Sequence, residues 1–422
     1  MQSSCIIQKG NRKNIRIDKC ISIIIILGGK VVMKPNVLLI AHESMINGAS
    51  FSLLGLIDKL IDRCNFIVVV PYNYGSFLDE LKKRNVKIYY VPFERWVKVK
   101  DDNFKKEKKN WKKQDDENNE LLARKMAEIL KNERIDVIHS NTSVVDFGYR
   151  LSKIMNVPHI WHIREYGEED FSMYPLCSER QYYKKISSNN NYLVFVSKNV
   201  MEKYKNKVSD DRVKVIYNGV DKKNLNPKKM FLKTKKEKLI CLQTGMINKA
   251  KGQDITIKAI EELRKEGYKN IELWLAGSGN LESMGIDPKK MKWLKLLGQV
   301  KDIENVRKDV NLEIVSSKKE AFGRVTVEAM MGQIPVIGSN SGGTKELIKD
   351  KETGLLYTSG DYKDLKEKIK YLYEHRDEIK RMGKNAYRYS KDYFLMDRCA
   401  NEIYELYDNI KENNESHSRH IG

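Results

Sequence analysis

Cysteine is scarce in this chain and widely scattered. The 422 residues contain six cysteines, at positions 5, 20, 64, 177, 241 and 399. No two of them have the spacing of a zinc clip or of a dithiol redox pair, so the sequence does not indicate a thiolate metal site or a catalytic disulfide. Isolated thiols of this kind suit a protein that stays in a reducing cytoplasm.

The chain also lacks an apolar run of transmembrane length. Near the N-terminus, residues 20–27 are apolar, but this run is far short of the roughly 20 residues that a membrane-spanning helix needs. Its length does fall within that of a signal peptide's apolar region. We expect residues 1–32 to be an extension that does not belong to the fold, with Met33 as the native start, because residues 34–41 already have the pattern of a first α/β strand.

Acidic residues are the minority charge: 57 Asp and Glu stand against 78 Lys and Arg, a formal charge of +21 with a pI near 9.4. This balance favours a polyanionic partner, which could be nucleic acid, an anionic membrane surface or a phosphorylated substrate. An alternative explanation of the excess positive charge is an overall composition that is rich in Lys, Asn and Ile. The length predicts two domains of about 180 residues each, because a single core rarely grows so large.

Short apolar strands alternate with helices along most of the chain. The first alternating unit is predicted to have strands at 37–41, 66–70, 86–91, 137–139, 158–161 and 192–197. The second is predicted to have strands at 239–246, 271–276, 294–297 and 310–315, followed by helices at 362–374 and 376–410. Alternation of this kind predicts an α/β protein with parallel sheets, whose ligands bind beyond the carboxyl ends of the strands.

The most informative stretch runs from Ser316 to Met331. It follows a buried strand and leads into a helix, so the free N–H groups of the first helical turn converge on one point and favour an anion there. Glu320 lies in the loop and Glu328 lies in the helix, where each can meet a different part of one ligand. A solvated helix that happens to carry two acids is the alternative interpretation.

A family resemblance depends on this stretch. The Glu-x7-Glu spacing that encloses Phe322-Gly323, followed by residues 332–337 and 341–346, resembles the donor-binding core of the retaining GT-B glycosyltransferases of family 4. The resemblance implies two Rossmann-like domains with parallel sheets that face a central cleft, and a C-terminal helix that crosses back to the first domain. It also implies that Glu320 touches the transferred sugar and that Glu328 holds the ribose.

The resemblance implies further site residues. His162 would contact the donor sugar near the reacting carbon, although a lone histidine is more often structural. The other donor-binding residues that it implies are Gly48, Gly245, Lys251, Gly298, Val300, Phe322, Gly323, Arg324 and Val325. Additional candidates for acceptor or donor contacts are Asn47, Arg164 and Glu165.

One position departs from the family pattern. The family usually places an arginine directly after the glycine that corresponds to Gly245, where it shares the diphosphate charge with Lys251. This chain has Met246 there. One fixed positive charge therefore remains where two are expected, and Arg164 or Arg324 could supply the second.

The segment 95–119 interrupts the alternation with dense charge around Trp96, Phe104 and Trp111. Charge runs are usually solvated loops or helix faces, which is the interpretation that we favour. Basic residues interleaved with aromatic residues would also suit contact with an anionic membrane or a lipid-phosphate acceptor.

The sequence thus predicts a retaining glycosyltransferase that moves a sugar from a nucleoside diphosphate sugar to the hydroxyl of a glycan or lipid-linked acceptor. We expect it to act in bacterial cell-surface polysaccharide or glycolipid synthesis, in the cytoplasm or peripherally on the inner face of the membrane. The sequence has no strict Asp-x-Asp, the usual sign of the metal-dependent class, so no metal or cofactor is expected. The alternatives are a nucleotide-sugar epimerase of the same fold and a basic nucleic-acid-binding protein, although no nucleic-acid motif is present.

The predicted domain boundaries follow from the same pattern. After the extension, an acceptor-side domain is expected over 33–212 and a nucleotide-sugar-binding domain over 213–390. A crossover helix is expected over 391–412, and residues 413–422 are expected to form a disordered tail.

Overall fold

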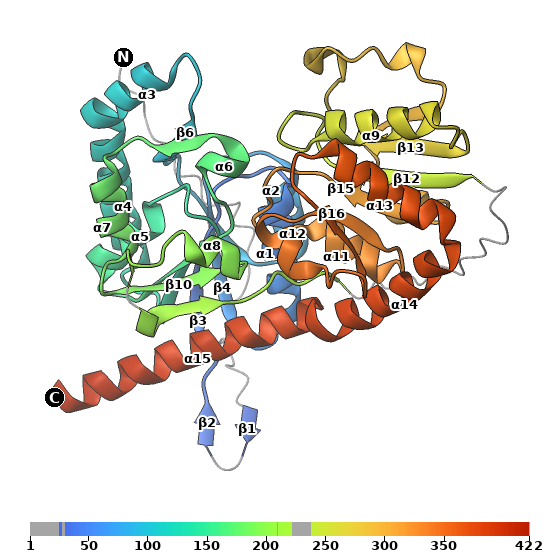
Figure 1. Ribbon diagram of the computed structural model, residues 1–422. Helices are drawn as coiled ribbons and strands as arrows, with labels where there is room; N and C mark the ends of the chain where they lie inside the picture. The colour runs from blue at the N-terminus through green and yellow to red at the C-terminus, as the bar shows by residue number, and fades with distance from the viewer. Residues whose placement is uncertain (1–24, 28–29, 209, 222–237, 422) are drawn as a thin grey trace.

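The computed structural model describes residues 25–27, 30–208, 210–221 and 238–421, and it shows two α/β lobes side by side (Figure 1). The expected start at Met33 concerns a terminus that lies largely outside the described residues. Just before Met33, β1 (Ile25–Leu27) and β2 (Lys30–Val32) form an antiparallel pair that projects from the N-terminal lobe.

The N-terminal lobe is built on a parallel sheet of seven strands. In spatial order these are β11 (Val213–Val215), β10 (Asn191–Phe195), β8 (His159–Ile163), β7 (Val137–Ser140), β3 (Asn36–Ile40), β4 (Asn65–Val70) and β5 (Lys87–Tyr90). Because β11 pairs with β10, residues 213–215 belong to this lobe, and the domain boundary falls after them and not before them as predicted.

The C-terminal lobe contains a second parallel sheet, of six strands. Their spatial order is β14 (Leu294–Gly298), β13 (Ile271–Ala276), β12 (Leu239–Thr244), β15 (Leu312–Val315), β16 (Val336–Ser339) and β17 (Gly354–Tyr357). Two parallel sheets with helices on both faces confirm the predicted fold class, two Rossmann-like domains of the GT-B type.

Helices cover both faces of each sheet because the strands are apolar on both sides. In the N-terminal lobe these are α1 (Gly48–Leu60), α2 (Ser76–Lys83), α4 (Asp116–Leu130), α5 (Phe147–Met155), α6 (Glu168–Phe171), α7 (Glu179–Ile186) and α8 (Lys198–Glu202). In the C-terminal lobe they are α9 (Gln253–Lys265), α10 (Ile303–Arg307), α11 (Arg324–Met331), α12 (Gly342–Leu347), α13 (Tyr362–Glu374) and α14 (Arg376–Tyr393). Short 3₁₀ turns are η2 (Asp210–Arg212), η4 (Glu282–Met284) and η5 (Pro288–Lys290).

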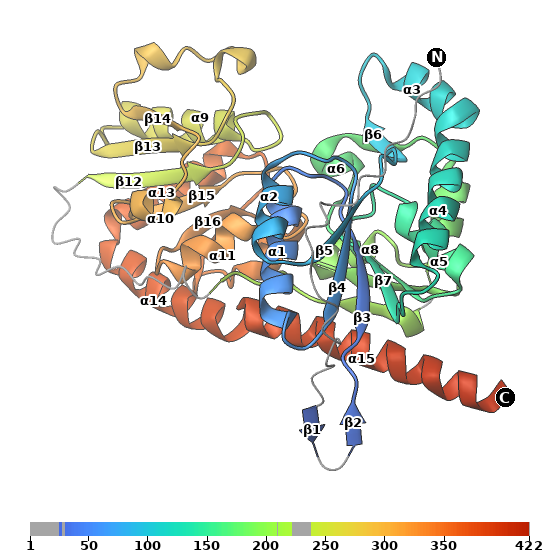
Figure 2. The same cartoon turned by 180° about the vertical axis from the view of Figure 1, so that it is seen from behind.

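The last helix, α15 (Met396–Ile421), runs beneath the N-terminal lobe, and α14 precedes it beneath the C-terminal lobe, as the two opposite views show (Figures 1 and 2). Its side chains from Met396 to Ile410 share a core with α1 and strands β3 and β4, so the predicted crossing back to the first domain is present. The prediction of a disordered tail from residue 413 is wrong for the residues up to Ile421, because the helix continues to that residue. Once packing has formed the first turns, each added residue gains a backbone hydrogen bond.

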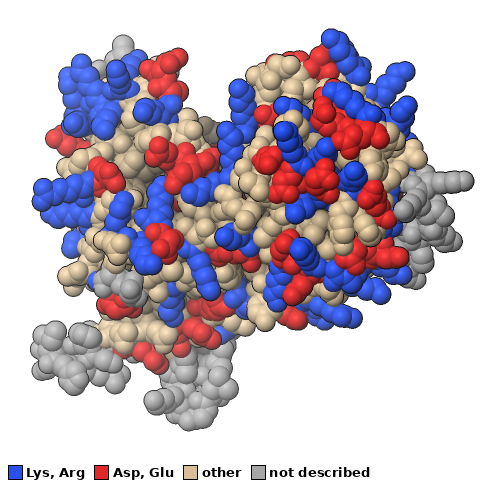
Figure 3. Space-filling view, viewed as in Figure 1, with Lys and Arg blue, Asp and Glu red and all other residues tan. Residues whose placement is uncertain are grey.

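The charged segment 95–119 is not a solvated loop, because most of it forms regular secondary structure. It forms β6 (Val97–Val99), α3 (Phe104–Asn110) and a π-helical turn, η1 (Trp111–Asp115), that leads into α4. Strand β6 pairs in antiparallel fashion with β9 (Met173–Pro175). Lysines and arginines gather on the surface around α3 (Figure 3), as expected for a charged helix face.

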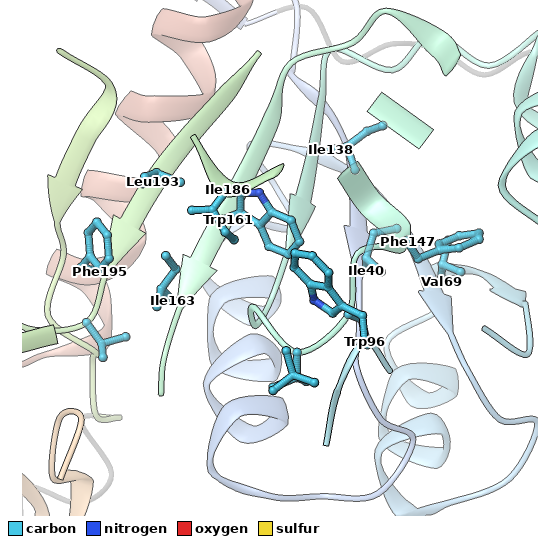
Figure 4. Close-up of a cluster of buried hydrophobic side chains, with 14 of the residues drawn as sticks. Ile40, Val69, Trp96, Ile138, Phe147, Trp161, Ile163, Ile186, Leu193 and Phe195 are labelled. Carbon is cyan, nitrogen blue, oxygen red and sulfur yellow. The ribbon is translucent and has the colours of Figure 1, made fainter. Parts of the chain in front are cut away.

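The aromatic residues of this segment face inward. Trp96 and Trp111 are buried in the core beneath the sheet, and Trp96 stacks on Trp161 with ring centroids 5.9 Å apart (Figure 4). The indole N–H of Trp96 donates to the carbonyl of Ser143 at 2.8 Å. These two side chains therefore stabilise the fold and are not available to a membrane surface, so the alternative of membrane contact does not extend to them. For the basic residues of the segment, membrane contact stays a prediction. Within the described ranges, no helix is both long and apolar enough to cross a membrane.

Candidate active site

A cavity of about 590 Å³ lies between the two lobes. The carboxyl ends of β3, β7 and β8 supply one wall, and the ends of β12 and β15 supply the other. The predicted site residues that line it are Asn47, Gly48, Arg164, Glu165, Gly245, Lys251, Glu320, Phe322, Gly323, Arg324 and Val325. Residues more than 250 positions apart in the sequence therefore meet in one space, at the edge where parallel sheets deliver ligands.

Lys251 and Glu320 form an ion pair on the C-terminal wall. The Lys251 Nζ lies 2.5 Å from Glu320 Oε1, and the hydroxyl of Ser317 donates to the same oxygen at 2.6 Å. Lys251 comes from the loop after β12, and Glu320 comes from the loop after β15. The pair fixes the carboxylate from two sides, so Glu320 is oriented before any ligand enters.

Two adjacent glycines hold the Glu320 loop in place. The N–H of Gly343 donates to the carbonyl of Glu320 at 2.7 Å. A Cβ atom on Gly343 would lie 2.6 Å from the carbonyl of Phe322, and one on Gly342 would lie 2.5 Å from that of Glu320. Gly342 also has a φ of +55°, which side-chain-bearing residues rarely adopt. The Gly-Gly motif is therefore required by close backbone approach.

The start of α11 presents free backbone donors to the cavity. Gly323 adopts a φ of +96° and turns the chain into the helix. Among the described residues, the N–H groups of Arg324 and Val325 have no hydrogen-bond acceptor. On the opposite wall, the first turn of α1 is already capped, because the Asn47 side chain accepts the N–H groups of Ala49 and Ser50 at 3.0 Å. The donors free for an anion are thus mainly on α11.

Glu328 does not line the cavity but lies directly behind it. Its carboxylate is 3.4 Å from the guanidinium of Arg324 and 3.5 Å from that of Arg307. Arg307 is fully buried and also pairs with Glu313 at 2.9 Å and Glu304 at 2.6 Å. Burial lowers the pKa of Arg307, but the three carboxylates more than reverse this effect and keep it protonated. Sequence reasoning missed Arg307 because it belongs to no motif.

His162 is placed differently from what the sequence suggested. It is fully buried in β8 and is not among the residues that line the cavity. Its Nδ1 lies 3.2 Å from Nε2 of His139 and 3.2 Å from Nη2 of Arg164. Contact between His162 and a sugar therefore remains a prediction, and the Nδ1 of His162 faces Arg164, which lines the cavity.

Other histidines and acids on the N-terminal wall have strongly shifted pKa values. His42, which lines the cavity, has a pKa lowered to about 3 by burial and by Arg95 and Arg164, so its ring is neutral. Burial raises the pKa of Glu165 to about 7, although its carboxylate accepts hydrogen bonds from Ser143. Sequence reasoning did not select His42, although it belongs to the loop that contains Gly48.

The remaining predicted residues lie outside the cavity. Gly298 is the last residue of β14 and Val300 follows it, at the same carboxyl edge of the second sheet, but neither residue lines the cavity. Met246 is 59% exposed and carries no charge where the family places an arginine. Among the described residues, no three His, Cys, Asp or Glu side chains converge to hold a metal ion.

Contacts across the lobes fix how the two walls face each other. The Glu346 carboxylate on α12 accepts the backbone N–H groups of Lys198 at 3.0 Å and Asn199 at 2.6 Å, at the start of α8. The hydroxyl of Tyr217 donates to it at 2.9 Å. Arg324 donates to the hydroxyl of Ser52 on α1 at 3.0 Å. These bonds join the lobes beside the cavity.

Comparison with known protein families supports what the geometry indicates. The model "Glycosyltransferase Family 4" matches residues 46–224, and the model "Glycosyl transferases group 1" matches residues 226–389. The two matches meet near the boundary between the lobes, and together they account for both walls of the cavity.

Individual proteins resemble the chain more distantly. An uncharacterized glycosyltransferase of Methanocaldococcus jannaschii is 27% identical over 291 residues, which are 67% of this chain and 78% of that protein. The capsular polysaccharide biosynthesis glycosyltransferase CapM of Staphylococcus aureus is 27% identical over 177 residues, 40% of this chain and slightly under half, 46%, of CapM.

The fold has solved counterparts. The crystal structure of Anabaena HepE in complex with UDP superposes with a TM-score of 0.71 at 19% identity, covering 89% of this chain and 99% of HepE. Taken with the two parallel sheets and the interdomain cavity, these matches establish that the chain belongs to the GT-B glycosyltransferases, with a family 4 module followed by a group 1 module.

Proposed function

We propose that the protein transfers a sugar from a nucleoside diphosphate donor to an acceptor hydroxyl with retention of anomeric configuration. The observation that carries this proposal is the Lys251–Glu320 pair, which lies beside the free N–H groups of Arg324 and Val325 in one interdomain cavity. These groups match the needs of a departing diphosphate, which gains negative charge as the glycosidic bond breaks. HepE, with the same fold, was crystallised with UDP and with UDP-glucose, which supports a nucleotide-sugar donor.

In this proposal the C-terminal wall holds the donor. Lys251 and the α11 N–H groups stabilise the leaving diphosphate, and Glu320 fixes the sugar while positive charge develops at its anomeric carbon. Glu320 is assigned to positioning and not to attack. A leaving phosphate oxygen takes the proton of the acceptor hydroxyl on the same face, which yields retention. Glu328, set behind the cavity by Arg307 and Arg324, would hold the ribose of the donor.

We further propose that the acceptor is a glycan or a lipid-linked glycan of the bacterial cell surface. Support comes from CapM, whose name places it in capsular polysaccharide biosynthesis. The acceptor would enter from the N-terminal wall, where His42, Glu43 and Arg95 line the cavity. The cationic surface around α3 is the feature that could bring the protein to an anionic membrane (Figure 3).

The test is a panel of nucleoside diphosphate sugars incubated with the purified full chain and candidate acceptors. We expect release of one nucleoside diphosphate to depend on the acceptor, and NMR of the product to show the donor's anomeric configuration. A product with inverted anomeric configuration would contradict retention but not sugar transfer itself. Conversion of donor without acceptor would indicate an epimerase instead, and no turnover or binding with any donor would remove the proposal.

A further inference from the structure

Five cationic side chains line the interdomain cavity, and four of them have carboxylate partners within 4 Å. Lys251 pairs with Glu320 at 2.5 Å, Arg95 with Glu43 at 2.9 Å, Arg324 with Glu328 at 3.4 Å and Lys319 with Glu169 at 3.5 Å. Arg164 is the fifth. Among the described residues, no carboxylate forms an ion pair with its guanidinium.

The partners of Arg164 are all uncharged. Its Nε donates to the carbonyl of Asn141 at 2.9 Å, and Nη1 donates to the side-chain oxygen of Asn218. Its Nη2 lies 3.2 Å from Nδ1 of His162. Glu165 follows directly in the chain, but its carboxyl accepts from Ser143 and from the backbone of Arg164 instead.

The hydrogen-bond geometry fixes the protons on the two histidines behind Arg164. A guanidinium can only donate, so His162 Nδ1 must be the acceptor. The neighbouring Nε2 of His139, 3.2 Å away, then carries a hydrogen and donates to the same atom. His139 Nδ1 is left to accept the hydroxyl of Tyr407, at 2.5 Å. Both rings are neutral, and burial with the Arg164 charge lowers both pKa values far below their usual range.

A chain of neutral groups, Tyr407–His139–His162, therefore runs from helix α15 to the back of Arg164. It orients the guanidinium without neutralising it. Burial lowers the pKa of Arg164 to about 10, so the side chain is still charged at neutral pH. Arg164 is partly buried in the cavity wall, where a charge without a counter-charge is costly, and a ligand anion in the cavity would remove that cost.

The opposite, C-terminal wall has one positive charge fewer than the family pattern. Where the family places an arginine, Met246 is exposed and uncharged, and the nearby Lys251 is already paired with Glu320. A diphosphate on this wall would meet one partly compensated cation. We propose that Arg164 of the N-terminal lobe supplies the second positive charge by binding a phosphate group of the ligand, and that Tyr407, His139 and His162 are its positioning residues. This inference rests on the proposed function, and we assign the phosphate to the donor's diphosphate.

Calorimetry on the full chain tests this assignment. Wild-type protein is titrated with UDP, GDP, ADP and CDP, and the tightest binder is then compared with its parent nucleoside. Arg164→Gln should weaken nucleoside diphosphate binding about tenfold to a hundredfold, because a hydrogen bond to a charged group is lost, and should leave nucleoside binding unchanged. Arg164→Lys, which keeps the charge, should recover part of the loss.

Tyr407→Phe tests the positioning chain, because Tyr407 lies outside the cavity. We expect about a two- to fivefold loss of diphosphate affinity without a loss of nucleoside affinity, which a general packing defect would not produce. Arg124→Gln, an exposed arginine of α4, is the charge-matched control and should bind like wild type. Circular dichroism checks each fold, and if Arg164→Gln does not fold, Arg164→Lys and Tyr407→Phe carry the test.

The outcomes separate this inference from the proposed function. If Arg164→Gln binds the diphosphate with wild-type affinity, the inference is wrong and the proposed function still stands. If Arg164→Gln does not fold, wild-type diphosphate affinity in both Arg164→Lys and Tyr407→Phe has the same consequence. Normal diphosphate binding with a raised KM for the acceptor alone would assign the phosphate to the acceptor and overturn the donor assignment. A wild-type protein that binds none of the four diphosphates would overturn both proposals.

Discussion

The two walls of the cavity carry charge in different ways. On the C-terminal wall, Lys251 is paired with Glu320, and the buried Arg307 behind it is surrounded by three carboxylates. On the N-terminal wall, Arg164 is held by neutral amide oxygens and one imidazole. Paired charges preserve geometry when the cavity is empty, whereas a cation without a carboxylate partner is left for an anion that arrives with the ligand. The C-terminal wall therefore orients its charged groups by pairing them, whereas the N-terminal wall orients a cation through neutral groups.

Removing the centre of the paired cluster should produce the largest effect. Arg307→Met leaves the buried carboxylate of Glu313 without its cation and removes the partner of the partly exposed Glu304. We expect a loss of about 3–5 kcal/mol in the free energy of unfolding. Urea denaturation of the purified chain measures it. Arg381→Met, which removes an exposed arginine from the same lobe, is the control and should cost less than about 1 kcal/mol. A cost equal to the control's would show that the cluster does not stabilise the lobe.

The Lys251–Glu320 pair should matter for turnover more than for folding. We expect Lys251→Ala and Glu320→Ala each to lower kcat about 100- to 1000-fold, since each removes a group set to stabilise charge in the transition state. Thermal melting should show that the fold is retained. Lys249→Ala, which changes an exposed neighbour, should turn over like wild type. Wild-type kcat in both cavity variants would remove the catalytic assignment from this wall.

The neutral imidazoles make the N-terminal lobe sensitive to acid. His159 is buried between Ser140 and Asn191, and burial lowers its pKa to about 3. Because the folded pKa lies below the unfolded value of about 6.5, the imidazole's contribution is present above pH 6.5 and is lost as the pH falls toward 3. Between pH 7 and pH 5, this one ring should lower the free energy of unfolding by about 2 kcal/mol.

His159→Gln should therefore flatten the pH dependence of unfolding between pH 7 and pH 5, even though it lowers stability at pH 7. Urea titrations at the two pH values measure the slope. His375→Gln, which changes an exposed histidine of the C-terminal lobe, is the matched control. If both variants kept the wild-type slope, acid sensitivity would not distinguish the two lobes.

The smallest expected effect concerns the contact that sets the walls opposite each other. Glu346→Ala removes the acceptor of the Lys198 and Asn199 N–H groups. Because the side chain is partly exposed, we expect a loss of about 1 kcal/mol, seen as a roughly fivefold lower kcat/KM. Small-angle scattering should show a larger radius of gyration than wild type. The control is Glu367→Ala, at an exposed position of α13, which should change neither kcat/KM nor the radius of gyration. An unchanged radius of gyration in Glu346→Ala would show that this contact does not hold the lobes together.

Much of the fold could be predicted from the sequence, because strand and helix periodicity is a local property. The strands at 271–276 and 37–41 were placed within one residue of β13 and β3. The errors occurred where tertiary contacts decide. Residues 213–215 pair with a strand of the first lobe, and Trp96 and Trp111 are drawn from a charged segment into the core.

The cavity residues divide in the same way. The sequence by itself indicated Lys251, Glu320 and Gly343 as site residues through a family resemblance, and the backbone turns and the helix start around them are encoded locally. Only the tertiary structure decided that His162 lies behind Arg164, that Arg307 supports Glu328, and that a hydroxyl from α15 ends the imidazole chain. Those contacts join residues that are 2 to 268 positions apart in the sequence. The neighbours of each side chain depend on how the sheets and helices pack, and the periodicity of the sequence does not encode that packing.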